Sequence, residues 1–398
     1  MENIKKMIIF FCLSMIGIGC NHKKKRPDID STKIQAISIP DPGKGIEINL
    51  SNFANNVRII SLEYSKESTI GKIKKIMSFK NRYYILDEQN NSGILVYNLN
   101  GKYVGKIGKV GKGPSEHINL TDFDIDEYSG KLYMYDNDQN KIIQYNSDGV
   151  YIESLVTNHW GDNFAINNDI FYIYRNNSSF GIGDLFVNGM KNSNKEYYFK
   201  PIPSYSSLFS ERMFSHFNNG IDVTKPYCDT VFFHKEEKMS SKYYIDFGRY
   251  KVKQDDIGIL FGDDKNKRLN TLIKNKYAYN VTDFYEFQDL AYFSFTSNFV
   301  KHYCFYDKKN NIPIYGSTIV NDLNYMFFST VVGKSQHELF GVYRPDDISS
   351  NIDYINTLLK TKDQKIKEKL MSSLTFLNSQ KRQGIENLNP AIMVYSLK

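Results

Sequence analysis

Cysteine and alanine are scarce in this sequence, and each scarcity excludes a class of structure. The 398 residues include four cysteines and six alanines. So few cysteines exclude a small domain held together by disulfide bonds, and a chain of this length buries a large core without them. Cys228 and Cys304 lie in apolar, strand-like runs where buried free thiols are common, although one disulfide between them stays open. Because alanine is the best helix former, its shortage argues against a mainly helical fold.

Catalytic and metal-binding motifs are also lacking. The sequence has no Gly-x-Ser-x-Gly elbow of a serine hydrolase, and His337-Glu338 is not followed by the second histidine of a zinc metalloprotease. Asp136–Asn140 begins like a calcium loop, but Lys141 and Ser147 replace the glycine and the glutamate that such a loop requires. The sequence therefore predicts a turn at Asp136–Asn140, no metal site and no cofactor.

Charge of one sign accumulates at one place in the chain. The formal net charge is +7, but most lysines are dispersed among acidic and asparagine-rich turns, so nucleic acid is not an expected partner. The dense basic cluster is Lys23–Arg26, close to an N-terminal apolar run. Such a cluster suits the anionic headgroups of a membrane.

The N-terminal apolar run, residues 7–16, is too short for a transmembrane helix, which needs about 20 apolar residues. Two lysines precede it and Gly17–Cys20 follows, which gives the three parts of a signal peptide. The final Ile-Gly-Cys20 resembles a bacterial lipobox, with Gly17 where leucine is usual. We therefore expect residues 1–20 to be a lipoprotein signal peptide and Cys20 to carry the lipid that anchors the protein to the outer membrane of the cell envelope. An uncleaved anchor and ordinary secretion are the alternatives.

Aromatic residues, in contrast, are abundant. The chain has 30 tyrosines and 27 phenylalanines. Aromatic side chains suit a pleated, half-buried surface, so this composition predicts an all-β protein.

A repeat of 48 to 49 residues indicates the architecture. Tyr83–Asp87 and Ile94–Tyr103 match Leu132–Asp136 and Ile142–Tyr151. Each unit contains a strand ending in aspartate, a polar loop, a second strand and a tight Asn-Gly or Asp-Gly turn into a third. With one more strand before each unit, the repeat has four antiparallel strands, which is the pattern of a propeller blade.

Later segments continue this pattern and complete a six-bladed β-propeller over residues 46–398, after a linker at 21–45. An exposed strand edge is a liability, so we expect the N- and C-terminal strands, Asn56–Leu62 and Ala391–Leu397, to close the ring within one blade. The remaining blades are expected at 164–199, 212–247, 284–314 and 318–343.

Helical periodicity interrupts the last blade. Apolar residues recur at helical spacing between Asp346 and Asn378, with Thr361–Gln364 as a capping box between two helices. We expect a helical insertion at about 346–380, packed on one rim of the propeller. A membrane-surface helix is the alternative, although its lysines do not gather on one face.

Several motifs together resemble the six-bladed β-propeller lipoproteins of Bacteroidota, which are similar to NHL-repeat propellers. The motifs are Asn100–Glu116, Asp122–Asp126, Tyr227–Thr230, Tyr244–Gly248 and Glu386–Pro390. The resemblance covers the chain from about Ile46 to its end. It implies a propeller fold and a location in the cell envelope, without an assigned reaction.

Gly108–Ser115 is one residue away from a nucleotide-binding P-loop, because Pro114 stands where the lysine should be. It lies between two predicted blades, without the preceding parallel strand and following helix that a P-loop needs. We therefore interpret it as a connection between blades and expect no nucleotide there. Loops on a rigid scaffold often carry function, so its polar side chains are candidate ligand-binding residues. The full candidate set is Lys112, Glu116, His117, Arg175 and Asp322.

Two functions of different classes fit these observations. A lipid-anchored propeller presenting aromatic loops to a glycan, a peptide or a partner protein is favoured, because no catalytic constellation is recognisable. An enzyme, a lyase or hydrolase with its site at the mouth of the central channel, is the alternative. A concave pocket with several perturbed polar groups would indicate the enzyme, and a broad apolar patch would indicate the binding module.

Overall fold

The computed structural model describes residues 27–90, 92–175, 184–190, 195–199, 212–260, 262, 264–360 and 363–398. The predicted signal peptide, Cys20 and the basic cluster Lys23–Arg26 lie outside this part of the chain. None of the described helices is long and apolar enough to cross a membrane.

The protein is all-β, as predicted, and most of its strands belong to four-stranded antiparallel sheets in which chain neighbours pair. The first three sheets are β4–β7 (Ile73–Phe79, Arg82–Asp87, Ile94–Asn98, Tyr103–Ile107), β10–β13 (Leu120–Ile125, Leu132–Asp136, Lys141–Tyr145, Tyr151–Val156) and β14–β17 (Asn163–Asn167, Ile170–Tyr174, Leu185–Gly189, Glu196–Tyr198). The first two of these sheets are the two predicted repeat units.

The later sheets follow the same order. They are β18–β21 (Phe214–Phe217, Gly220–Val223, Thr230–Lys235, Lys238–Asp246), β22–β25 (Ala278–Glu286, Leu290–Ser297, Val300–Asp307, Ile312–Gly316) and a sheet of β27 (Val331–Lys334), β28 (Glu338–Tyr343), β29 (Ala391–Leu397) and β3 (Ala54–Ile60). In the last sheet β29 pairs antiparallel with β3, opposing Val57 to Tyr395, so the predicted pairing of the two terminal segments is present.

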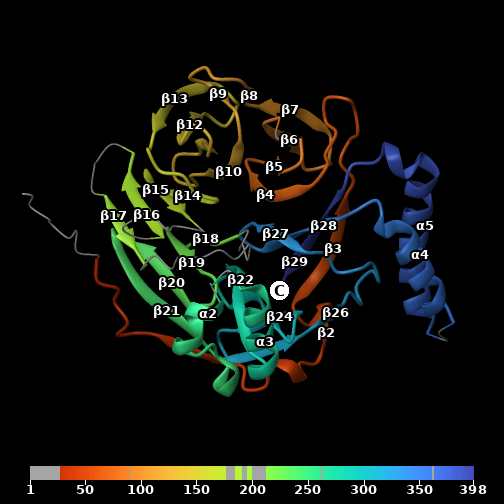
Figure 1. Cartoon of the computed structure of the whole chain (residues 1–398). Coiled ribbons are helices and arrows are strands. Elements are labelled where there is room, and N and C mark those ends of the chain that lie inside the picture. The colour runs from red at the N-terminus through yellow and green to blue at the C-terminus, as the bar shows by residue number, and fades with distance from the viewer. Residues whose placement is uncertain are drawn as a thin grey trace, which may run out of the picture.

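The sheets lie around a common centre with their first strands innermost (Figure 1). These inner strands contact one another in the order β4, β10, β14, β18, β22 and β27, and β27 contacts β4. Antiparallel pairing places the turns between first and second strands at one end of this centre, and the connections between successive sheets at the other end.

Three aspartates fasten the second sheet to the third. The carboxylates of Asp122, Asp124 and Asp126 each accept a hydrogen bond from a backbone N–H of the next sheet, at Phe164, Ile166 and Asn168. The donors and the acceptors are both spaced two residues apart, which is the period of side chains on one face of a strand. The aspartates therefore satisfy the inner edge of β14, which would otherwise expose unpaired N–H groups.

Buried tyrosines fill the space between sheets, which explains their abundance. Tyr97, Tyr135 and Tyr145 are almost fully buried, and each hydroxyl donates to a backbone carbonyl, at Ser68, His159 and Ser115 respectively. Each ring thus contributes apolar area to the core while its polar tip stays hydrogen-bonded.

The predicted helical insertion is present as α4 (Asp347–Leu358) and α5 (Gln364–Gln383), which lie at the outer edge of the molecule (Figure 1). The N-cap of α5 is Asp363, whose carboxylate accepts from the backbone N–H groups of Lys365 and Ile366. The prediction that a capping box starts at Thr361 therefore misplaces the helix start, and Thr361 itself lies outside the described residues.

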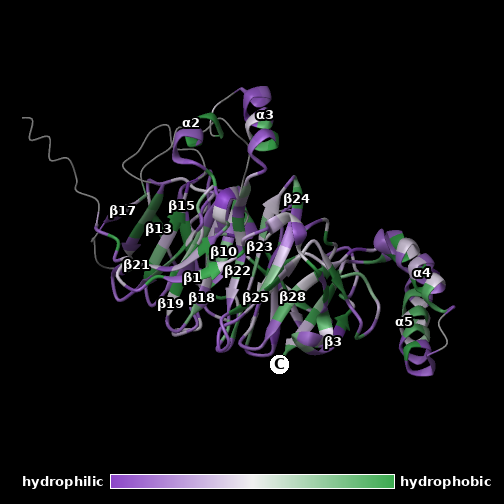
Figure 2. Cartoon of the chain, turned by 90° about the horizontal axis from the view of Figure 1, so that it is seen from below, coloured by the Kyte–Doolittle hydropathy of each residue, from purple (hydrophilic) through white to green (hydrophobic). Residues whose placement is uncertain are grey.

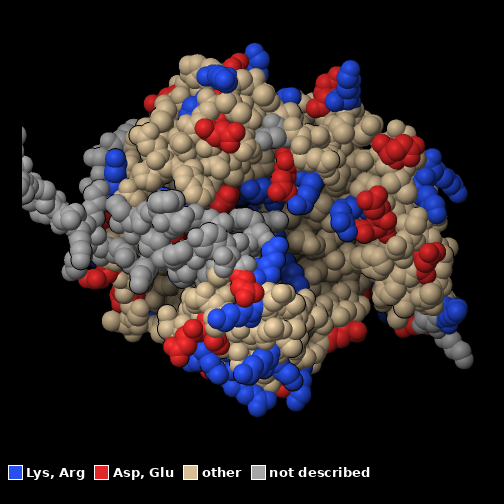
Figure 3. All heavy atoms as spheres, viewed as in Figure 1, with Lys and Arg blue, Asp and Glu red and all other residues tan. Residues whose placement is uncertain are grey.

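Two further helices, α2 (Ile257–Leu260) and α3 (Lys265–Asn275), were not predicted. They lie between β21 and β22 and project from one face of the molecule (Figure 2). Figure 3 shows basic side chains gathered on this face where α3 lies, in agreement with the lysines and the arginine in its sequence. The 3₁₀ turns η3 (Gly248–Tyr250) and η4 (Gln254–Asp256) precede them, and η5 (Ile385–Asn387) follows α5.

Part of the segment predicted as a linker, 21–45, pairs with a later strand. Within 21–45, β1 (Gln35–Ser38) adds a parallel fifth strand to β21, followed by the turn η1 (Pro42–Lys44). Next, β2 (Glu47–Asn49) pairs parallel with β26 (Thr318–Val320), and η2 (Leu50–Asn52) leads into β3. The prediction that the last sheet starts at Thr318 is therefore wrong. Thr318–Val320 pairs with the N-terminal segment, and the last sheet begins at Val331. Cys228 and Cys304 are both free thiols.

Candidate functional site

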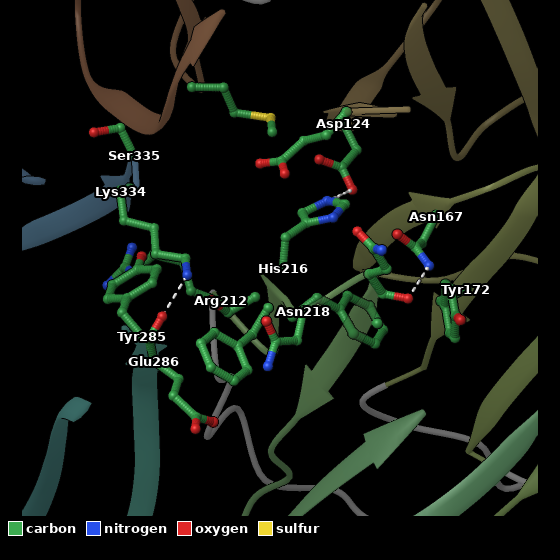
Figure 4. Close-up of a pocket in the computed structure, with 18 of the residues that line it drawn as sticks. Asp124, Asn167, Tyr172, Arg212, His216, Asn218, Tyr285, Glu286, Lys334 and Ser335 are labelled. Atoms are coloured by element: carbon green, nitrogen blue, oxygen red, sulfur yellow. Dashed lines mark hydrogen bonds and ion pairs between the residues drawn. The ribbon is translucent and has the colours of Figure 1, made fainter. Parts of the chain in front are cut away.

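A cavity of about 920 Å³ lies at the centre of the molecule, lined by the inner strands β4, β10, β14, β18, β22 and β27. Its lining continues onto the turns that join first to second strands, including Asn167–Ile170, Phe217–Gly220 and Lys334–His337. The cavity therefore belongs to the end of the centre where these turns lie. Charged side chains reach it from strands far apart in the sequence (Figure 4).

One charged group joins β4, β10 and β18. Lys75 Nζ lies 3.2 Å from Asp122 Oδ1, and His216 Nε2 lies 2.8 Å from Asp124 Oδ2. Burial opposes the charged form of His216, but the Asp124 carboxylate outweighs it, so the pKa of His216 is raised. Burial likewise opposes ionisation of Asp124, yet His216 and Lys75 together lower the pKa of this carboxyl.

A second group surrounds Asp283 on β22. Arg212 Nε lies 2.5 Å from Asp283 Oδ1, and Lys301 Nζ lies 2.8 Å from Asp283 Oδ2, which also accepts from the Ser294 hydroxyl at 2.9 Å. Burial would raise the pKa of Asp283, but the two cations lower it well below its ordinary value. Asp283 is therefore a fully ionised anchor for two cations beside the cavity.

A third group lies around Glu286 at the end of β22. Lys308 Nζ is 2.6 Å from Glu286 Oε1, and Lys242 contacts both Glu286 and Asp222, the latter at 2.9 Å. Burial raises the pKa of Asp222 to about 7, with Glu286 adding to the rise and Lys242 opposing it.

Lys334, on β27, differs from Lys242 and Lys308 because no described carboxylate forms an ion pair with it. Its Nζ donates to the backbone carbonyl of Glu286 at 2.6 Å and lies 5.1 Å from the ring centre of Phe287 and 5.8 Å from that of Phe217. Burial lowers the pKa of Lys334 to about 8, against the opposing effect of Asp222, Glu127 and Glu286. Figure 4 shows this side chain next to Tyr285 and Glu286 at the cavity wall.

The residues singled out by the sequence lie elsewhere. Lys112 is exposed and Glu116 half-buried in the connection between the first two sheets, where β8 (Lys109–Val110) pairs parallel with β9 (Glu116–His117). His117 is buried beside them. The structure brings these three residues together but not into the lining of the central cavity.

Arg175 and Asp322 lie apart from this connection and from each other. Arg175 follows β15, is buried, and donates its backbone N–H to the carbonyl of Asp184. Asp322 accepts from the backbone N–H of Ser51 at 2.9 Å and from its hydroxyl, so it fastens the N-terminal turn η2 to the segment before β27. Neither lines the central cavity.

The predicted turn at Asp136–Asn140 has a structural explanation. The Asp136 carboxylate accepts from the backbone N–H groups of Ile118 and Gln139, which holds the turn against the preceding connection. In the described part of the chain, no three acidic, histidine or cysteine side chains gather as a metal site.

The cavity residues missed by the sequence reasoning do leave a signal. Asp122 and Asp124 alternate with apolar residues at the start of a repeat, and Glu286 lies in the corresponding strand of a later sheet. Charged residues at the first strand of a propeller repeat face the centre, so their position within the repeat points to the cavity.

The chain belongs to the family described as "Domain of unknown function (DUF4934)", whose model matches residues 34–396. No curated protein matches the sequence. Among solved structures, a candidate exported protein of Bacteroides fragilis NCTC 9343 is similar at 17% identity and a TM-score of 0.72, over 92% of this chain and 100% of that one.

Two other solved structures are more distant. A member of the DUF4221 family from Bacteroides vulgatus has 11% identity and a TM-score of 0.49, over 87% of this chain and 99% of that one. Virginiamycin B lyase from Staphylococcus aureus has 12% identity and a TM-score of 0.40, over 72% and 82% of the two chains. At these identities the likeness concerns the fold alone.

Proposed function

We propose that this protein is a closed, six-bladed β-propeller that is lipid-anchored in the cell envelope and binds a polar ligand in its central cavity. The contacts of the inner strands around the centre and the β3–β29 pairing support the closed ring. The lipobox-like N-terminus and the similar candidate exported protein support the location.

The observation that carries the binding function is the cavity itself. Its volume of about 920 Å³ suits a small ligand or a segment of a larger one, and its wall combines aromatic rings with fixed charges. Most of these charges are already paired with each other, so they give the cavity a rigid polar wall. A glycan or a peptide segment of a partner protein fits such a wall, because both combine polar groups with faces that stack on aromatic rings.

Blocking the mouth tests this function. Gln288 and Gln336 line the cavity and are exposed, so Gln288→Trp and Gln336→Trp should narrow the mouth without disturbing the core. The soluble domain would first be screened by calorimetry against glycan and peptide libraries. A ligand found in this way should bind at least about tenfold more weakly to both variants, at unchanged melting temperature.

Lys112→Trp is the matched control, because it places the same bulk on the connection between sheets. If Lys112→Trp weakens binding and the mouth variants do not, the ligand binds at the connection and the cavity proposal is wrong.

Catalysis is the second candidate function, and the paired His216 and Asp124 beside Lys75 favour it. A histidine held by a carboxylate is a common general base. Conversion of a bound glycan or peptide into products, abolished by His216→Gln with ligand affinity retained, would establish the enzyme in place of the binding module.

A further inference from the structure

The lysines around Phe217 differ in their ion pairs. Three lysines approach this ring, with Nζ of Lys242, Lys308 and Lys334 at 4.4, 4.7 and 5.8 Å from its centre. Two buried carboxylates, Asp222 and Glu286, form the ion pairs to Lys242 and Lys308. Among the residues that the structure describes, no carboxylate forms an ion pair with Lys334, and Asp222, Glu127 and Glu286 act on it only from beyond ion-pair distance.

Lys334 also faces usable space. It lines the cavity, and its hydrogen bond to the Glu286 carbonyl uses one of the three protons of the ammonium group. Phe287, Phe217 and Tyr285 flank it with apolar surface. A cation that is largely removed from water is costly unless an anion pairs with it, and Lys334 is half-buried.

We propose that Lys334 binds a carboxylate group of the ligand in the central cavity, an inference that rests on the proposed binding function. A single lysine without an ion pair matches a singly charged anion. A phosphate group carries more charge and is usually held by several donors, by a bidentate arginine or by backbone N–H groups at a helix N-terminus. The aromatic flanks suit a carboxylate attached to a sugar ring or to the end of a peptide.

Matched pairs of probes test the charge and separate the two sources. The first pair is trigalacturonate and its methyl ester, and the second is an aromatic tripeptide with a free C-terminal carboxylate and its C-terminal amide. Calorimetry on the soluble domain should show that the acid of one pair binds on the order of tenfold more tightly than its neutral partner, which is typical of a charge-assisted hydrogen bond.

Substitutions then assign the preference to Lys334. Lys334→Met should bring the ratio of acid to neutral affinity close to one, whereas Lys334→Arg should retain most of it and show that the charge matters rather than the packing. Lys235→Met is the matched control, because Lys235 also lines the cavity but its side chain is 41% exposed. This variant should keep the wild-type ratio.

The outcomes separate the two proposals. If the acid and neutral members of a pair bind equally well to the wild type, or if Lys334→Met keeps the preference for the acid, the assignment of Lys334 is wrong while ligand binding stands. If neither pair binds at millimolar concentration, the binding function fails for both ligand sources and the assignment fails with it.

Discussion

The Gly108–Ser115 connection and the central cavity use similar residues in opposite ways. The connection has glycines and lysines in a spacing close to that of a P-loop, yet its polar groups bind one another: Glu116 accepts the backbone N–H of Gly113, and Lys109 lies 3.3 Å from the same carboxylate. The cavity has no sequence motif, yet it gathers cations and carboxylates from many strands. Glu116 therefore satisfies the N–H group and the lysine of the connection from within, whereas the cavity keeps space and a lysine without an ion pair among the described residues.

The pKa shifts of the charged groups also differ between the connection and the cavity. The Gly113 N–H and the nearby Lys109 lower the pKa of the half-buried Glu116, which strengthens the closed loop. In the charged groups at and beside the cavity, burial is the largest influence on the pKa values of Asp222, Asp283 and Lys334. The partners of Asp283 outweigh it, and those of Asp222 and Lys334 do not. A connection satisfied from within is a structural element, while a buried network that leaves one described lysine without an ion pair is a candidate binding site.

Removing the last strand should have the largest effect, because the cavity depends on the whole arrangement of sheets. Deletion of residues 391–398 removes β29, which pairs with both β28 and β3 and contributes five buried side chains, Ala391 to Tyr395. At about 1.5 to 3 kcal/mol for each large apolar side chain, the loss is about 10 kcal/mol, comparable to the whole stability of a typical domain.

Soluble yield and far-UV circular dichroism would measure this effect. Deletion of Lys398 alone is the control, since this residue is exposed and lies beyond β29. A deletion variant that melts at the wild-type temperature would show that the ring does not depend on β29.

The predicted and the missed elements show which parts of this fold have a local signal in the sequence. The repeat at Tyr83 and Leu132 predicted the first two sheets because Asn-Gly and Asp-Gly turns give a local signal. The parallel strands β1 and β2 were missed, since their partners β21 and β26 lie about 200 residues or more away. Helix α3 was missed because its sequence, KNKRLNTLIKN, is mostly polar and buries only Leu272.

The candidate site was harder to predict than the fold. Gly108–Ser115 attracted attention because a motif is contiguous in sequence, while Lys75 and Lys334 meet the same cavity from strands 259 positions apart. Which charged side chain stays unmatched depends on distances between such strands, and no single segment encodes them.

Asp283→Asn should have the next largest effect on stability. Together with a matched substitution in the connection, it compares the charged groups beside the cavity with those of the connection. The substitution keeps the shape of the side chain but leaves Arg212 and Lys301 beside the cavity without their carboxylate. Breaking a buried ion pair in this way costs about 3–5 kcal/mol. Urea unfolding would measure the loss.

Glu116→Gln is the counterpart in the connection, where the ion pair with Lys109 is largely exposed. Its effect on the unfolding free energy should be much smaller than that of Asp283→Asn. Equal losses would mean that the connection and the cavity network are equally structural.

A buried histidine, His234, and a half-buried one, His216, should sharpen the comparison through pH. Burial lowers the pKa of His234, which contacts the Tyr172 hydroxyl at 2.7 Å, to about 4, while the Asp124 carboxylate raises that of His216. Between pH 4 and 6.5, His234 is protonated in the unfolded chain but neutral in the folded chain. Acidification through this range therefore removes on the order of 3 kcal/mol of stability. His216 acts in the opposite sense, because its contribution is complete below pH 6.5 and is lost as the pH rises through its raised pKa.

Urea unfolding of His234→Gln and His216→Gln between pH 4.5 and 7.5 would separate these contributions. The first variant should lose less stability than the wild type on acidification, and the second should lose more. The same pH slope in both variants would contradict the assignment of opposite shifts.

Gly108→Val should have a smaller effect than Asp283→Asn, and it tests what the glycines of the connection do. Gly108 has a φ of 91°, and a Cβ there would lie 2.6 Å from Cε of Met134, so a branched side chain is both strained and crowded. We expect a loss of about 1–3 kcal/mol in thermal or urea unfolding. Gly113 is outside the positive-φ glycines, and its Cβ would approach the carboxylate end of Glu116 at 3.1 Å, so Gly113→Val should be milder than Gly108→Val.

Lys112→Ala is the control for a nucleotide site, because it removes an exposed lysine and should change neither the melting temperature nor the affinity for ATP or GTP. Micromolar nucleotide binding lost in Lys112→Ala would instead make the connection a binding site and reverse the comparison with the cavity.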